Sequence, residues 1–199
     1  MSDQGSFEGR TSEILCEFLE AAVHTALRVK GVYPPEVFER RRLYNVAVSR
    51  SRHPGLNAYV QETIFSLKPW IKQGKLERLA VLFFEEESDA LVERLVFSVK
   101  VLKEVEGSFE SLDDLEHMLR AFVLKIQVAE PLASRCRFEL LAYSWSREEG
   151  ERDPVWVMED AGGDRVSLRD PCITPIKSIS SDCLKIQLYS EAPRARAAE

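Results

Sequence analysis

The feature that most limits the fold of this chain is an unbroken apolar run at residues 79–84, Leu-Ala-Val-Leu-Phe-Phe. A strand without polar residues has to be covered on both faces, as in the middle of a buried sheet. An acidic stretch follows at 85–90, and residues 92–102 then alternate between apolar and polar side chains. The two runs therefore predict an antiparallel hairpin at the centre of a sheet.

Three segments of the sequence predict amphipathic helices. The first begins at Ser12, whose hydroxyl can cap the helix, and ends before Gly31. The second opens at Pro54, because a missing N–H costs nothing in the first turn, and should kink at Pro69. The third follows the capping sequence at Ser111 and repeats apolar residues at helical spacing.

The remaining segments complete the predicted architecture. Residues 137–145 and 184–189 have strand patterns, whereas 35–52 is interpreted as a loop or an irregular strand. The arginine run at 40–42 within this segment could contact DNA or an acidic partner. It also fits an ordinary solvated surface. Residues 146–153 form a charged, hinge-like stretch before a loosely patterned C-terminal quarter. This order predicts an α+β fold, with helices on one face of a mostly antiparallel sheet.

Length and charge narrow the class of protein. The chain has 199 residues, 45% of them hydrophobic, which fits one domain with a substantial core. A formal net charge of −6 argues against direct nucleic-acid binding, which depends on Lys and Arg at phosphates. We find no signal-peptide core and no apolar segment of about 20 residues. We therefore expect an intracellular protein that binds neither nucleic acid nor membrane.

The familiar motifs of catalysis are missing from the sequence. It contains no phosphate-binding loop and no nucleophile elbow, and its histidines do not stand at metal-ligand spacing. None of the four cysteines forms a C-x-x-C pair. We therefore predict no catalytic residue, no metal and no cofactor, and a binding protein instead. A thiol-dependent enzyme remains the alternative, although Cys16 lies in an apolar helix that suits a structural thiol.

Short strings along the chain carry a resemblance to a known family when they are taken in order. They are CEFLE at 16–20, VYP at 32–34, YNV at 44–46, HP at 53–54, LRAF at 119–122, DP at 170–171 and QLY at 187–189. From Ser12 to Tyr189 the chain resembles the HORMA-domain family, and within it the non-catalytic accessory subunits of DNA polymerase zeta.

The resemblance implies a fold and its boundaries. HORMA domains have three main helices on a mostly antiparallel sheet and a C-terminal "safety belt" that closes over a partner peptide. By this resemblance residues 12–189 form a single domain, with a core at about 12–145 and a belt at about 146–189. Residues 1–11 and 190–199 are expected to be disordered ends.

The resemblance also implies two binding surfaces. Tyr59 on the second helix and Trp156 in the belt match residues that hold a Pro-containing peptide of the polymerase catalytic subunit. Ile173, Gln187 and Tyr189 match belt residues that dock the C-terminal domain of a Y-family polymerase scaffold. The last two alternate with the apolar residues of the final strand, so they should point away from the core.

Further implications concern assembly and pathway. Arg120 matches a residue used for homodimerisation or for pairing with another HORMA protein. An AAA+ ATPase that reopens the belt is implied by family analogy. The expected function is a non-catalytic adaptor in translesion DNA synthesis, located in the nucleus or also in the cytoplasm. A HORMA adaptor in the cell-cycle checkpoint, the meiotic axis or the control of double-strand-break repair is the alternative.

Overall fold

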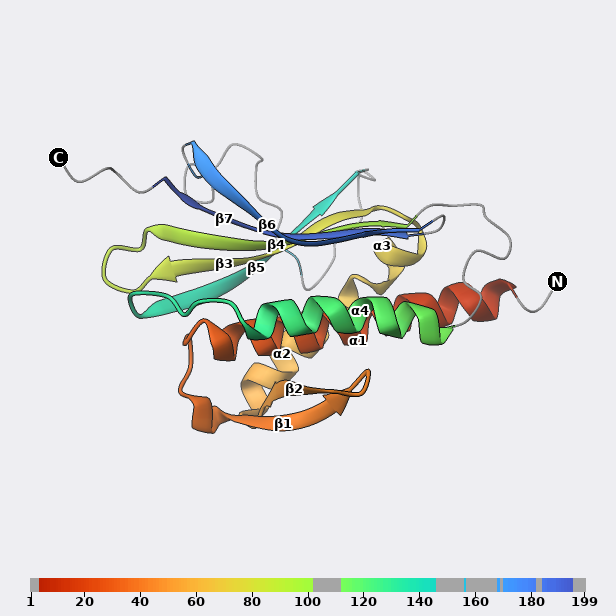
Figure 1. The fold of residues 1–199 in the computed structure, drawn as a ribbon, viewed down its shortest axis with the longest axis horizontal. Coiled ribbons are helices and arrows are strands. Elements are labelled where there is room, and N and C mark those ends of the chain that lie inside the picture. Colours follow the sequence, from red (N-terminus) through yellow and green to blue (C-terminus); the bar gives the residue numbers. More distant parts are fainter. Residues whose placement is uncertain are drawn as a thin grey trace.

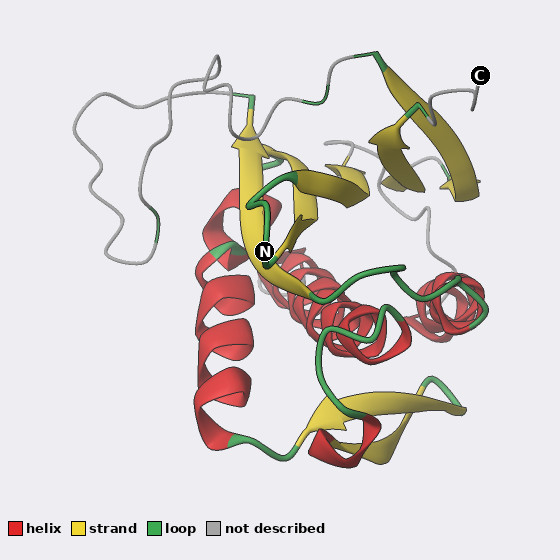
Figure 2. Ribbon diagram, turned by 90° about the vertical axis from the view of Figure 1, so that its left-hand side faces the viewer, coloured by secondary structure: helices red, strands yellow, loops and turns green. Residues whose placement is uncertain are grey.

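The chain folds into three stacked layers (Figures 1 and 2). The computed structural model describes residues 4–101, 112–145, 156, 168, 170–181 and 184–194. A five-stranded sheet forms one outer layer, the helices lie in the middle, and a two-stranded sheet lies on the other side of the helices. None of the helices in these residues is long and apolar enough to cross a membrane.

The five-stranded sheet has the order β5-β3-β4-β7-β6, and all its pairs are antiparallel. Its strands are β3 (Leu76–Glu85), β4 (Leu91–Val101), β5 (Cys136–Ser144), β6 (Pro171–Ser180) and β7 (Leu184–Pro193). The apolar run 79–84 lies in β3, between two neighbouring strands, and all six of its side chains are buried. The predicted central hairpin is therefore confirmed.

In the part of the chain that the structure describes, four α-helices make up the middle layer: α1 (Gln4–Val29), α2 (Pro54–Ser66), α3 (Lys68–Lys72) and α4 (Leu112–Gln127). α1 starts inside the stretch expected to be disordered, and Ser12 is buried within it instead of capping its start. α2 begins at Pro54 as predicted, and His53 caps it by accepting the Leu56 N–H at 3.3 Å. The expected kink before Pro69 divides α2 from α3.

Residues 35–52 differ from the loop or irregular strand that the sequence predicted. After a short 3-10 helix, β1 (Phe38–Leu43) and β2 (Val46–Ser51) form a regular antiparallel hairpin. Its two-residue turn, Tyr44 and Asn45, has φ angles of 48° and 59°, the left-handed conformation of a type I′ turn. The arginine run 40–42 lies exposed on β1.

The C-terminal strands also extend beyond the prediction. β6 occupies residues that have no regular alternation, and β7 continues to Pro193, past the expected start of the tail at residue 190. The pairing of β6 with β7 slips between Pro175 and Lys177, which explains why the apolar pattern of β6 is irregular.

The main core joins the helices to the sheet. Phe18 of α1 makes edge-to-face contacts with Phe97 of β4 and Phe122 of α4, at centroid distances of 6.1 and 5.9 Å. A smaller cluster lies on the opposite face of the sheet, where Leu168 and Tyr189 pack on buried apolar residues: Ala80, Leu82, Phe84, Leu91 and Val96. Both faces of β3 are therefore covered.

His24 makes the stability of this core depend on pH. The side chain is 1% exposed, neither ring nitrogen has a hydrogen-bond partner among the residues that the structure describes, and burial lowers its pKa from 6.5 to about 4. Between these two pH values the His24 ring is protonated in the unfolded chain and neutral in the folded chain. The free energy of unfolding should therefore fall as the pH drops from about 6.5 towards about 4. Urea unfolding across this range should show a steeper acid loss for wild type than for His24→Leu.

The comparison with His24→Leu is needed because the pKa of a neighbouring carboxyl group is shifted as well. Burial raises the pKa of Glu20, which favours the folded state in acid and opposes the histidine effect. The difference between the two proteins isolates the histidine. Parallel pH profiles would contradict the assignment.

Candidate peptide-binding site

One edge of the large sheet is formed by β5. In the described residues β5 pairs with β3 on one side only, so its other side presents backbone N–H and C=O groups without a strand partner. Exposed strand edges are templates on which another extended chain can add. Inner-face residues Phe138, Leu140 and Ala142 pack against the main core, as the strand pattern predicted.

A row of three aromatic rings borders this edge on the helix side. Phe138 of β5 lies at its centre, with edge-to-face contacts to Tyr59 of α2 at 5.8 Å and to Tyr33 at 6.2 Å. Tyr59 is 44% exposed, which is high for a large aromatic side chain. Exposed aromatic surface beside an open strand edge suits the side chains of an added peptide, in particular proline rings.

The Tyr59 hydroxyl is coupled to the edge itself. Burial raises its pKa, while a hydrogen bond with the Leu140 backbone opposes that rise. Tyr59 therefore contacts β5 twice, through the Phe138 ring and through the strand backbone. A side chain held in this way is positioned before any peptide arrives, which reduces the entropy lost on binding.

Trp156 lies at the junction of α2 and α3. Its indole N–H donates to the Ser66 hydroxyl at 2.6 Å, and its ring stacks on Trp70 at 6.2 Å with an angle of 28° between the planes. Ser66 in turn donates to the Thr63 carbonyl at 2.7 Å. Tyr59 and Ser66 are about two turns apart and share one face of α2. The structure thus brings both predicted peptide-binding residues to α2.

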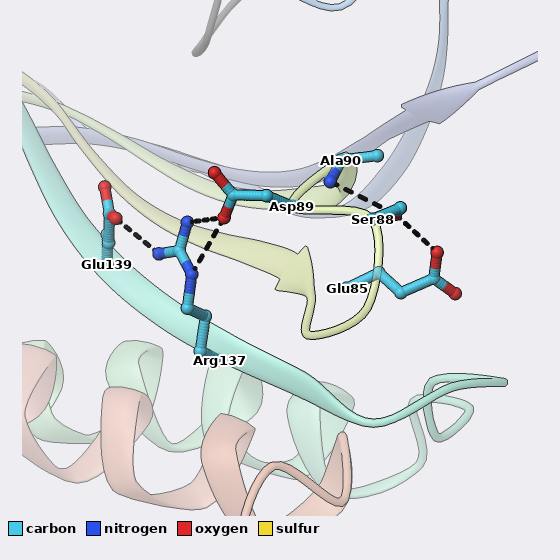
Figure 3. Close-up of polar contacts among 6 residues, drawn as sticks. All are labelled: Glu85, Ser88, Asp89, Ala90, Arg137 and Glu139. Atoms are coloured by element: carbon cyan, nitrogen blue, oxygen red, sulfur yellow. Dashed lines mark hydrogen bonds and ion pairs between the residues drawn. The ribbon is translucent and has the colours of Figure 1, made fainter.

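A polar cluster fixes the start of β5 against the β3–β4 turn (Figure 3). The Arg137 guanidinium pairs with both Asp89 and Glu139, and it lies 4.3 Å from the Phe84 ring centroid. The bond to Asp89 is the main cause of the raised Arg137 pKa. Ser88 donates to Glu85 at 2.6 Å within the same turn. These contacts connect the start of the edge strand to the β3–β4 turn, next to the aromatic row.

The second predicted surface lies on the face of the sheet away from the helices. Gln187 is exposed and Tyr189 half-buried, while the alternating residues of β7 are buried in the main core, as predicted. Ile173 of β6 is 57% exposed and pairs opposite Glu191, two positions from Tyr189 on the same face. The structure therefore groups Ile173, Gln187 and Tyr189 on one surface, separate from Tyr59.

The other predicted residues lie apart from these surfaces. Arg120 is half-buried on α4 and joins neither group. Burial raises the pKa of the Cys16 thiol to about 12, so this cysteine is a poor nucleophile. Within the described part of the chain, no group of three or more His, Cys, Asp or Glu side chains is arranged to hold a metal ion.

Several residues of the site were not assigned to it from sequence. Tyr33 was noted only within a family string and Phe138 only as a strand residue, because their contact spans about a hundred positions. Trp70 and Ser66, which anchor Trp156, have no local signal at all. The charged cluster around Arg137 likewise depends on the pairing of β5 with β3.

Comparison with known proteins identifies the family. No protein-family model matches the chain. MAD2B of Homo sapiens, a mitotic spindle assembly checkpoint protein, is 36% identical over 190 residues, which cover 90% of each chain. The DNA polymerase zeta processivity subunit of Arabidopsis thaliana is 35% identical over 192 residues, which cover 93% of this chain and 87% of that protein.

Solved structures agree on the fold. A chain of the mitotic checkpoint complex has a TM-score of 0.77 at 24% identity and covers 92% of this chain and 98% of its own length. HTP-2 of C. elegans, bound to a HIM-3 closure motif, has a TM-score of 0.74 at 14% identity, with 93% and 91% covered. The predicted α+β architecture is therefore confirmed as a HORMA domain. Within that class, the chain belongs to the family of MAD2B and the DNA polymerase zeta processivity subunit.

Proposed function

We propose that the chain is a non-catalytic adaptor subunit of DNA polymerase zeta in translesion synthesis. The observation that carries this proposal is the open edge of β5, with the aromatic row of Tyr33, Phe138 and Tyr59 beside it. The name of the plant relative, a polymerase zeta processivity subunit, supports the pathway. An extended, Pro-containing segment of the catalytic subunit adds to β5 and contacts Tyr59 and Trp156.

The belt closes over this peptide. Trp156 packs on the helix side of the sheet, whereas Leu168 packs on the opposite face. Two anchors on opposite faces are what a segment that wraps over a sheet edge requires. Such a segment slows dissociation, so its effect on affinity lies mainly in the off-rate. Residues 157–167, between the two anchors, lie outside the described residues.

The second surface joins another partner. Ile173, Gln187 and Tyr189 dock the C-terminal domain of a Y-family polymerase scaffold, while β5 holds the catalytic subunit. Because the two groups lie on opposite faces of the sheet, both partners bind together, and the protein bridges two polymerases. Tyrosine is among the residues enriched in interface hot spots, and the exposed Ile173 adds apolar area beside it.

The remaining features of the proposal rest on family membership. The adaptor acts in the nucleus, pairs with itself or with another HORMA protein through Arg120, and is reopened by an AAA+ ATPase. The checkpoint name of the animal relatives supports a second candidate, an adaptor in mitotic control. An adaptor role in the meiotic axis or in double-strand-break repair would require only that a different partner peptide binds to the same edge of β5.

Affinity purification from native nuclei tests the two surfaces, with partners identified by mass spectrometry. Wild type should recover a B-family and a Y-family polymerase. Trp156→Ala should lose the B-family enzyme at least tenfold, because a buried interface aromatic contributes about 2 kcal/mol or more. Tyr189→Ala should retain it and lose the Y-family enzyme.

Each variant is the control for the other, since both remove one large aromatic side chain. Unfolding midpoints should be measured in parallel to exclude a folding defect. Loss of both partners by each properly folded variant would contradict the two-surface arrangement. Recovery of checkpoint or meiotic proteins in place of polymerases would favour the second candidate.

A further inference from the structure

A pocket opens beside the start of β5, with a volume of about 670 Å³. Its walls come from the end of α1 and the segment that follows it, with Arg28 and Tyr33, and from Arg135 just before β5. Tyr33 belongs both to this pocket and to the aromatic row, through its contact with Phe138 at 6.2 Å. The pocket therefore continues the peptide-binding edge beyond the first residue of β5.

The charged groups of the pocket are both cations. Arg28 is half-buried, and it has no carboxylate partner among the residues that the structure describes. Arg135 contacts Glu86 at 3.7 Å, but the Arg135 side chain is 91% exposed, so this pair is weak and easily exchanged. The chain as a whole has a net charge of −6, so two arginines around one pocket are a local exception.

The end of α1 is closed by its own backbone, and the negative end of the helix dipole favours Arg28 in the last turn. Its last carbonyl groups are occupied, because Gly31 donates to the Arg28 carbonyl at 3.2 Å and Val32 to the Leu27 carbonyl at 3.1 Å. Gly31 has a φ of 73°, the left-handed conformation that this type of helix end requires.

We propose that this pocket binds a carboxylate of the partner peptide, an Asp or Glu side chain at the end that lies beside Arg135. This assignment rests on the proposed function, because it places the rest of the peptide along β5. A guanidinium binds a carboxylate through two parallel N–H···O bonds, so Arg28 and Arg135 select an acidic residue over a neutral one. The partner is thus an extended segment with a proline core and an acidic end.

A displayed peptide library tests the proposal. Its members carry one fixed proline among random positions, and they are selected on the full-length wild type, on Arg28→Ala/Arg135→Ala and on Arg40→Ala. Arg40 is an exposed arginine of the small sheet, on the far side of the helices, so Arg40→Ala controls for the loss of one positive charge away from the pocket. Wild type and Arg40→Ala should enrich Asp or Glu at one end of the peptide, and the double variant should not.

One selected peptide then gives the size of the effect. Replacing its terminal Glu by Gln should weaken binding to wild type about five- to tenfold, as expected for a partly exposed charge-assisted pair. The same replacement should leave binding to the double variant unchanged. An equal loss in both proteins would overturn the assignment of the pocket.

The library separates this inference from the proposed function. Proline-containing peptides without an acidic preference would overturn the carboxylate site and leave the peptide-binding edge intact. If no proline-containing peptide is enriched on any of the three proteins, the edge itself is not a peptide site. The proposed carboxylate site would then be contradicted as well, because it requires a peptide along β5.

Discussion

Replacing Glu191 with Gln is expected to destabilise the attachment of β7 to β4 by about 3 kcal/mol, because it removes one partner of a largely buried ion pair. The Glu191 carboxylate lies 2.5 Å from the Arg94 guanidinium, and the two side chains are only 10% and 15% exposed. The residues face each other across the paired strands. Gln keeps the shape of the side chain, so the loss measures the charge and not a cavity.

Asp170→Asn is the matched control on the same hairpin. Asp170 pairs with Arg194 at 3.2 Å, but both side chains are more than three-quarters exposed, at 78% and 76%. Exposed pairs contribute about 0–1 kcal/mol, so this variant should unfold like wild type. Hydrogen exchange should show faster exchange of β6 and β7 amides in Glu191→Gln alone. Equal protection in both variants would mean that the buried pair does not hold the hairpin.

This ion pair connects stability with the second binding surface. Ile173 lies opposite Glu191 on β6, and Tyr189 lies two residues before it on β7. A hairpin that detaches from β4 takes both side chains with it. Because Ile173, Gln187 and Tyr189 all lie on the β6–β7 hairpin, detachment would carry the proposed docking surface away from β4 as a unit, and the Arg94–Glu191 pair is one of the contacts that oppose it.

The parts of the fold that the sequence predicted are those with a local signal. The apolar run 79–84 indicated a central strand, and Pro54 marked the start of α2; the structure confirms both. The β1–β2 hairpin was missed because charged residues at 40–42 hide the alternation of an exposed strand. Asn45 was the available clue, since Asn is favoured where a two-residue turn requires a positive φ.

The candidate site was predictable only in part. Tyr59 and Trp156 were named through the family resemblance, and their local sequence contains nothing that distinguishes them from core aromatics. Tyr59 contacts Phe138, and Trp156 contacts Trp70. Both contacts depend on how α2 and α3 pack against residues far along the chain. The same holds for the Arg28–Arg135 pocket, whose two arginines meet only after folding.

Phe18→Ala should cost about 4 kcal/mol of unfolding free energy, the largest loss expected for a single side chain here. Phe18 is fully buried, and its edge-to-face contacts with Phe97 and Phe122 tie α1 to both the sheet and α4. A ring removed at this point leaves a cavity that three elements share. Phe18→Leu, which fills most of the space, should cost about 1–2 kcal/mol.

Urea unfolding of both variants, followed by two signals, tests whether the domain unfolds as one unit. Circular dichroism reports on the helices, and tryptophan fluorescence, measured with Trp145→Phe in every protein, reports on the Trp70–Trp156 stack beside the proposed peptide edge. Because Phe18 lies in the core shared by helices and sheet, both signals should shift together to lower urea. A fluorescence transition that stays at the wild-type midpoint would show that the Trp156 contact forms independently of this core. Peptide binding and domain stability would then have to be treated as separate equilibria.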